Sequence, residues 1–171
     1  GNTNYSAAAQ ATQNVTITQA TQTIIFGAQA AQTYAPSGTF AISPLATGGA
    51  SGNAVTYSST TTGVCTVSGT TVTIVSAGTC TIAANQAGNT NYSAAPQVTQ
   101  NVAINQAGQT ITFPAQTTAS RPFSAATFAI APLATGGASG NAVTYSSNST
   151  GVCTVSGTTV TIVAVGTCIL A

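Results

Sequence analysis

The sequence of 171 residues contains no Lys, Asp, Glu, His, Met or Trp, and one Arg is its only charged side chain. General acid–base catalysis uses His, Asp, Glu or Lys, and a Ser nucleophile needs a neighbouring base. Neither kind of group is present, so we expect that the protein is not an enzyme and has no catalytic residues. One Arg cannot form a basic surface, so no nucleic-acid partner is expected.

The same absences exclude the common metal sites. Zinc is held by clusters of Cys or His, and calcium is held by carboxylates. The chain has four scattered cysteines and no carboxylate side chain. We therefore expect no metal site, no cofactor-binding residues and no cofactor.

Long hydrophobic runs are also missing. A membrane helix needs about 20 consecutive apolar residues, whereas Thr, Ser, Gln, Asn or Gly interrupts every apolar run here within a few positions. No membrane insertion is expected. Disorder is not expected either, because 43% of the residues are hydrophobic and 1% are charged, the reverse of a disordered composition. Short runs of Thr, Val, Ile and Tyr between Gly, Ser, Asn and Pro favour β-structure.

The chain is a tandem repeat. Three segments occur twice, at an offset of 87 or 88 residues: Gly1–Ala8 and Gly88–Ala95, Pro44–Ser59 and Pro132–Ser147, and Thr62–Val75 and Thr150–Val163. The second copy carries one extra residue near Arg121. A period of about 87 residues is too long for one coil of a solenoid and has the size of an independently folding domain.

Apolar residues alternate with polar ones along each period, which predicts strands. Seven short strands separated by turn signals are typical of an immunoglobulin-like sandwich. We therefore predict an all-β fold of tandem immunoglobulin-like β-sandwiches with about seven strands each. In the first copy the inward-facing residues of these strands are Ile24 and Phe26, Phe40 and Ile42, Val55 and Tyr57, Cys65 and Val67, Val72 and Ile74, Cys80 with Ile82 and Ala84, and Val98 with Gln100, Val102 and Ile104.

The motifs AVTYSS, GVCTVSGTTVTIVSAGTCTIAANQAGNTNYSAA and QTITF resemble the bacterial Ig-like repeats of long secreted surface proteins. The resemblance covers essentially the whole chain. It implies an extracellular spacer, stalk or adhesin segment at the surface of a bacterium. The missing acidic residues depart from many such repeats and argue against linkers made rigid by calcium.

The four cysteines form two equally spaced pairs. Cys65 and Cys80 are 15 residues apart, as are Cys153 and Cys168. Four cysteines allow three pairings, of which repeat symmetry favours Cys65 with Cys80 and Cys153 with Cys168. Such disulfides indicate an oxidising, extracellular location. Four free thiols in a cytosolic protein, or cross-links between subunits, remain as alternatives.

The ends of the sequence fall inside the repeat. Residues 1–18 match Gly88–Asn105, which is the last turn and last strand of a period. We therefore expect three parts: residues 1–18 as the final strand of a preceding or neighbouring Ig-like domain, 19–105 as a complete domain, and 106–171 as a domain without its last strand.

An incomplete sheet leaves an open edge and an exposed core, which a strand from another copy can cover. We expect a structural subunit whose partner is itself, assembling head to tail into an extracellular filament by donor-strand complementation. The second copy also ends in a more apolar stretch (AVGTCILA) than the first (SAGTCTIA). The candidate donor residues are Ala11, Gln13, Val15 and Ile17, and the candidate acceptor or joint residues are Val165, Ile169 and Leu170.

Two alternatives stay open. The 171 residues can be a window of a longer array, in which case the protein is the stalk of a long adhesin. It can also be a carbohydrate-binding surface protein, although only five Phe and five Tyr are present and most fall on core-facing positions. A glycan partner is thus an alternative that no motif supports.

The composition predicts a stability that is nearly independent of acid. With no Asp, Glu or His, no side chain binds extra protons on unfolding between pH 6 and pH 2, so the free energy of unfolding should stay constant. Urea denaturation followed by circular dichroism at both pH values measures this. A large loss of stability at pH 2 would contradict the prediction.

Overall fold

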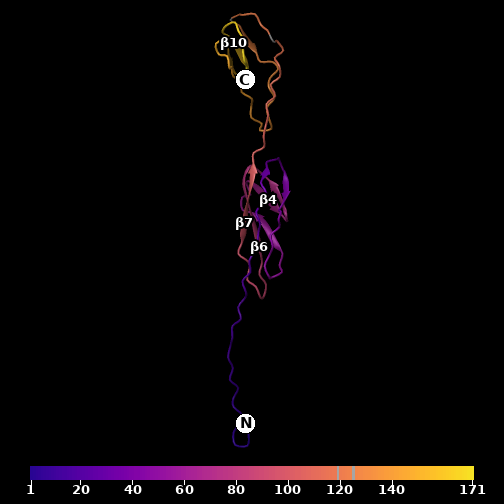
Figure 1. Ribbon diagram of the computed structural model, residues 1–171, viewed down its shortest axis with the longest axis vertical. Helices are drawn as coiled ribbons and strands as arrows, with labels where there is room; N and C mark the ends of the chain where they lie inside the picture. Colours follow the sequence, from indigo (N-terminus) through magenta and orange to yellow (C-terminus); the bar gives the residue numbers. More distant parts are fainter. Residues whose placement is uncertain (119, 125) are drawn as a thin grey trace. The chain divides into compact units, whose positions relative to one another are not determined.

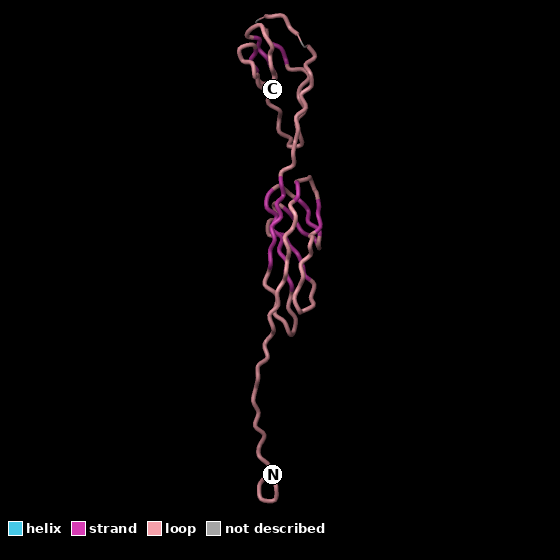
Figure 2. The backbone as a smooth tube through the Cα atoms, in the orientation of Figure 1, coloured by secondary structure: helices cyan, strands magenta, loops and turns pink. Residues whose placement is uncertain are grey.

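The computed structural model describes residues 1–118, 120–124 and 126–171. The described residues form an all-β structure without any helix, in which ten strands make three sheets (Figures 1 and 2). The chain divides into two compact units, Gly1–Ala107 (unit 1) and Gly108–Ala171 (unit 2).

Unit 1 contains two sheets. The larger has the strand order β1-β7-β6-β3 and the smaller has the order β2-β5-β4. The seven strands are β1 (Gln32–Thr33), β2 (Thr39–Ala41), β3 (Val55–Ser59), β4 (Cys65–Ser68), β5 (Thr71–Ile74), β6 (Gly78–Gln86) and β7 (Val98–Asn105).

The core of unit 1 is formed by both sheets. Val72 on β5 and Ile82 and Val102 on β6 and β7 are completely buried in a single cluster. Buried and exposed residues alternate along β7 because successive side chains of a strand point to opposite faces. The arrangement is compatible with a β-sandwich.

Unit 2 contains one sheet with the strand order β8-β10-β9, formed by β8 (Thr127–Ala129), β9 (Cys153–Ser156) and β10 (Thr159–Ile162). These strands repeat β2, β4 and β5 of unit 1. The buried part of its core is smaller and consists of Ile130, Cys153 and Val160.

Both hairpins of the small sheets turn at a glycine. Gly69 after β4 and Gly157 after β9 have φ values of 58° and 59°, in the left-handed region that glycine adopts without steric cost. The two-residue loop with glycine first matches the twist of the flanking strands.

The disulfides are Cys65–Cys80 and Cys153–Cys168, with Cα atoms 5.6 Å and 5.5 Å apart. These are the pairs favoured by repeat symmetry, and the structure leaves no free cysteine. In unit 1 the bond joins β4 of one sheet to β6 of the other. The disulfide therefore ties the two sheets together across the core.

One predicted strand is wrong. Residues 24–26 form only an isolated bridge between Ile25 and Thr47, although Ile24 and Phe26 are buried and Ile25 is exposed, as the alternation predicts. The strand β1 was not predicted, because its two residues pair in parallel with the end of β7 and have no alternating pattern of their own. The other six predicted strands lie on β2 to β7.

Residues 106–171 were predicted to form a domain of about seven strands without the last one, but the described part of unit 2 has three strands. The sequence AVTYSS of β3 recurs at residues 142–147, but there it forms only one bridge, between Ser147 and Leu170. In unit 1 the same sequence is paired with β6 from Val55 to Ser59. Strand formation here depends on the neighbouring strand and not on local propensity alone.

Removal of the disulfide of unit 1 should be costly. Replacing Cys65 and Cys80 by Ala should lower the free energy of unfolding of unit 1 by about 3 kcal/mol, because the bond closes a loop of about 15 residues. Urea denaturation with hydrogen exchange separates the two units. The control replaces the exposed Ser58 and Ser68 by Ala, and a similar loss in both variants would contradict the prediction.

Candidate functional site

The strand β7 closes the core of unit 1. It pairs with β6 in antiparallel register from Gly78 opposite Ile104 to Ala84 opposite Val98, and with β1 in parallel register. Its inward-facing Val102 and Ile104 are buried. β7 therefore lies between two strands, with its apolar face on the core.

One inward-facing residue of β7 is polar. The side-chain Nε2 of Gln100 donates a hydrogen bond of 2.7 Å to the backbone oxygen of Phe26. The bond provides a partner for a carbonyl group of residues 24–26, which pair with the rest of the chain only through the isolated bridge between Ile25 and Thr47. Gln100 thus connects β7 to the neighbouring segment while its apolar neighbours fill the core.

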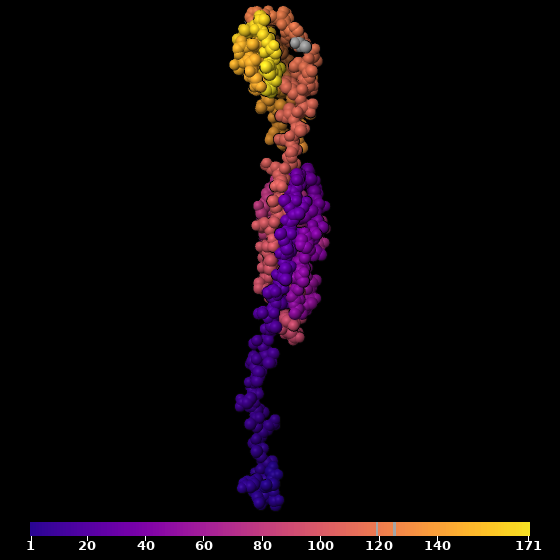
Figure 3. All heavy atoms as spheres, in the orientation of Figure 1, coloured from indigo at the N-terminus to yellow at the C-terminus, as the bar shows by residue number. Residues whose placement is uncertain are grey.

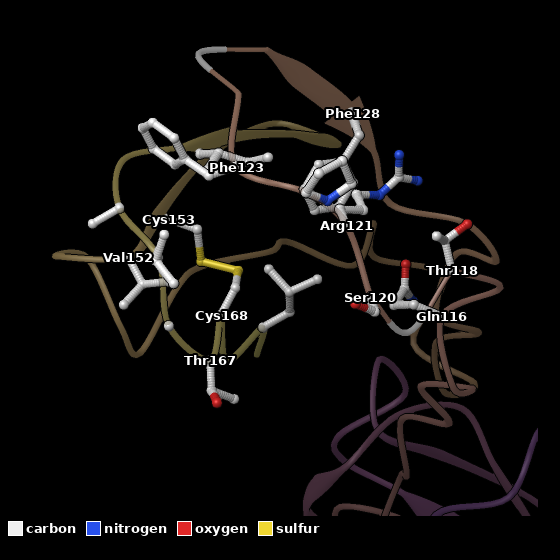
Figure 4. A pocket seen from close by; sticks show the side chains of 16 residues that line it. Gln116, Thr118, Ser120, Arg121, Phe123, Phe128, Val152, Cys153, Thr167 and Cys168 are labelled. Atoms are coloured by element: carbon white, nitrogen blue, oxygen red, sulfur yellow. A yellow bond between two sulfur atoms is a disulfide. The ribbon is translucent and has the colours of Figure 1, made fainter.

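Unit 2 has a cavity of about 330 Å³ (Figure 4). It lies beside the segment of unit 2 that corresponds to the β7-pairing part of β6 in unit 1. One wall contains Gly166, Thr167, Cys168 and Leu170, which are counterparts of residues at the start of β6. In unit 1 this part of β6 pairs with β7. In Figure 4 the open space lies between the Cys153–Cys168 disulfide and the side chains of Gln116, Ser120 and Arg121. We call this cavity the groove. Its lining residues are Gln116, Thr118, Ser120, Arg121, Pro122, Phe123, Phe128, Val152, Cys153, Ile162, Ala164, Val165, Gly166, Thr167, Cys168 and Leu170.

Several residues of unit 2 are less buried than their counterparts in unit 1. Cys80 is completely buried, whereas Cys168 is half-buried, and Phe113 is more exposed than its counterpart Phe26. Ile24 and Ile111 differ strongly as well, since they are 6% and 64% exposed. Since the local sequences are nearly identical, the difference reflects the strand and turn that cover unit 1.

The polar groups of the groove are already partly engaged. The guanidinium carbon of Arg121 stands 4.3 Å from the ring centre of Phe128, a cation–π contact. The side chain of Gln116 accepts a hydrogen bond from the backbone of Ala131 and donates one to that of Pro132. The groove therefore offers apolar surface and strand backbone, with one positive charge at its wall.

The candidate donor segment is exposed. Residues 1–18 are exposed throughout and have no strand, and Figure 3 draws them in indigo. Val15 and Ile17 are 80% and 87% exposed, whereas their counterparts Val102 and Ile104 are buried in β7. Ala11 and Gln13 are exposed as well. The structure therefore brings these four residues to no core of their own chain.

The predicted acceptor residues divide into two groups. Val165 and Leu170 line the groove, whereas Ile169 is not among its lining residues and is 51% exposed. The backbone N–H of Ile169 donates to Oγ of Ser149. Its side chain points away from that of Leu170, because successive side chains of an extended chain alternate.

Sequence reasoning missed the opposite wall, which includes Phe123. This wall is the counterpart of the segment from Gln29 to β1, which was itself not predicted. The extra residue near Arg121, where the two copies lose their register, was the one signal in the sequence.

Metal-binding clusters of three or more His, Cys, Asp or Glu side chains do not occur in the described residues. Nor does the described chain have a helix long and apolar enough to cross a membrane. A scan of protein-family models, a search of curated proteins and a search of solved structures give no match to this chain.

The two copies provide a matched pair for testing the groove. In unassembled chains, Ile24→Ala should destabilise unit 1 by about 2–4 kcal/mol, because it creates a cavity. Ile111→Ala should change unit 2 by less than about 1 kcal/mol, since this side chain is mostly exposed. Urea denaturation with unit-resolved hydrogen exchange measures both, and equal losses would show that unit 2 is covered as unit 1 is.

Proposed function

We propose that the protein is a structural subunit of an extracellular filament built from Ig-like modules, and that residues 11–18 of one copy fill the groove of the next. One observation carries the proposal. The groove lies where β7 lies in unit 1, and the exposed residues 11–18 repeat the sequence of β7 with changes only at Ala11, Thr16 and Thr18.

We call the proposed contact between residues 11–18 of one copy and the groove of the next copy the joint. Its register follows from the pairing of β6 with β7 in unit 1. Transferring the pairing of β6 with β7 by the repeat offsets puts Val15 opposite Cys168 and Ile17 opposite Gly166. Gln13 then lies opposite Leu170. Val15 and Ile17 would take the places of Val102 and Ile104, and alternation would turn Thr12, Asn14 and Thr16 outward.

Gln13 has a defined partner in this register. Its counterpart Gln100 donates to the backbone oxygen of Phe26 at 2.7 Å, so Gln13 would donate to the backbone oxygen of Phe113. The polar residue of the donor is thus explained by a hydrogen bond inside the joint, where an unpaired amide would be costly.

The joint has a clear source of free energy. Burying Val15 and Ile17, which are almost fully exposed, contributes roughly 1.5–3 kcal/mol for each side chain. The backbone of the donor would also pair with strand edges, as in other strand additions. Both contributions oppose the entropy lost when an exposed segment becomes ordered.

Repetition of such a contact favours a filament. Donor and acceptor are different surfaces of the same chain, so the contact is heterologous and continues from copy to copy unless a ring closes. A net charge of +1 gives little repulsion between copies. The two disulfides and the resemblance to secreted surface repeats favour an extracellular location.

The joint is tested by placing charges on the two faces of the donor. Val15→Asp with Ile17→Asp should abolish filaments, because two carboxylates would enter an apolar groove. Thr12→Asp with Thr16→Asp adds the same charge on the outward face and should leave assembly intact. Electron microscopy and sedimentation velocity measure both variants beside the unaltered 171-residue chain.

Three outcomes overturn the proposal: filaments from the inward-face variant, loss of filaments in both variants, and monomers from the unaltered chain. The last outcome would favour the alternative in which the chain is a stalk segment or fills its own groove. Filaments from the unaltered chain and the outward-face variant alone would support strand donation.

A further inference from the structure

The N-terminal turn is already folded in the exposed segment. The backbone N–H of Asn2 donates to the backbone oxygen of Tyr5 at 2.9 Å, and Oδ1 of Asn2 accepts from the N–H groups of Asn4 and Tyr5 at 3.0 and 3.1 Å. A Cβ at Gly1 would collide with the backbone oxygen of Tyr5, so the turn requires glycine there.

The same turn occurs in unit 1 before β7. The N–H of Asn89 donates to the oxygen of Tyr92 at 2.8 Å, and Oδ1 of Asn89 accepts from Asn91 and Tyr92 at 2.8 and 3.0 Å. A Cβ at Gly88 would meet the oxygen of Tyr92. The exposed turn thus has the conformation of the docked one, which lowers the entropy cost of docking.

In unit 1 the turn is held by several side-chain amide contacts, one of which is a hydrogen bond of 2.7 Å from Nε2 of Gln19 to the backbone oxygen of Asn89. Three others are formed by Gln22, Asn53 and Asn89. Nε2 of Gln22 donates to the backbone oxygen of Ser93 at 2.9 Å, and Nδ2 of Asn53 donates to that of Gly88 at 2.9 Å. In return, Nδ2 of Asn89 donates to the backbone oxygen of Ser51 at 2.9 Å. Gln22 is buried by this docking.

Unit 2 has the receptor for such a turn in the same arrangement. The counterparts of Gln22, Ser51 and Asn53 are Gln109, Ser139 and Asn141, and all three are exposed. Oε1 of Gln109 accepts from the N–H of Ser139 at 3.3 Å, and the N–H of Asn141 donates to Oγ of Ser139 at 3.3 Å.

The same two bonds occur in unit 1. There the N–H of Ser51 donates to Oε1 of Gln22 at 2.8 Å, and the N–H of Asn53 donates to Oγ of Ser51 at 3.4 Å. The receptor of unit 2 is therefore preformed, with the amide donors of Gln109 and Asn141 directed to no partner among the described residues.

We infer that the turn Gly1–Ser6 of one copy docks on Gln109, Ser139 and Asn141 of the next copy. The inference rests on the proposed strand donation and gives the joint a second, polar part. Three bonds follow from unit 1: Gln109 Nε2 to the oxygen of Ser6, Asn141 Nδ2 to the oxygen of Gly1, and Asn2 Nδ2 to the oxygen of Ser139.

The turn fixes the register of the donated strand. The inward pattern of a strand repeats every two residues, so a slip by two still points apolar side chains inward. Such a slip moves the turn by roughly 7 Å, at about 3.3 Å for each residue, and removes all three bonds. The turn and residues 11–18 keep the spacing of Gly88–Asn105, so both parts can dock together in one register only.

The test uses Asn2→Asp in the full chain. Asp keeps the side-chain oxygen that forms the turn but loses the Nδ2 donor and turns a carboxylate toward the oxygen of Ser139. The free subunit concentration that coexists with filaments should rise at least about fivefold relative to Asn4→Asp. Asn4→Asp is the matched control, because its counterpart Asn91 forms its bonds through the backbone alone.

The receptor is tested by Asn141→Ala, which should raise the free concentration about fivefold, with Asn148→Ala on the same unit as the control. Turn docking is wrong if Asn2→Asp and Asn141→Ala leave the same free subunit concentration as their controls. Strand donation still stands in that case if Val15→Asp with Ile17→Asp blocks assembly. If the unaltered chain forms no filaments, strand donation fails, and turn docking with it.

Discussion

The pairing of β6 with β7 is the interaction on which the rest of unit 1 depends. β7 supplies two buried side chains, and the turn before it buries Gln22 through hydrogen bonds. β6, held between β7 and β3, in turn makes β3 a strand. Unit 2 has no counterpart of β7 among its described residues. There Ile111 is 64% exposed where Ile24 of unit 1 is 6% exposed, and the copy of β3 keeps one bridge.

Amide side chains form the buried polar contacts of unit 1, in place of charged groups. Gln22 and Gln86 are the buried polar residues of the described chain, and both donate and accept within the core of unit 1. No buried side-chain nitrogen or oxygen lacks a partner in the part of the chain that the structure describes. An amide can satisfy a carbonyl and an N–H at once, and it does so without a charge that must be desolvated.

Much of the fold could be predicted from the sequence because it depends on local alternation and on the repeat. Alternation predicted the inward faces of β2 to β7, and repeat symmetry predicted both disulfides. The bridge at Ile25 and the short β1 could not be predicted, since each depends on a distant partner. The wall of the groove near Arg121 was missed for a related reason. The inserted residue breaks the repeat there, and with it the comparison between copies.

The near-identity of the donor and β7 raises the question of why residues 11–18 would not displace β7 from unit 1. β7 is tethered to its own sheet, so its effective concentration is in the millimolar range or above for a short connection. It also has Val98 and Pro96 where the donor has Ala11 and Ala9. Val98 packs against the core of unit 1, and Ala11 has less apolar surface to offer. A segment of another copy therefore competes poorly with β7 in unit 1, because it is not tethered there and buries less apolar surface. In unit 2 it meets no tethered competitor among the described residues. Residues 11–18 and β7 can thus be nearly identical in sequence and still differ in the proposed role, because β7 is tethered to its own sheet and the proposed donor belongs to another copy.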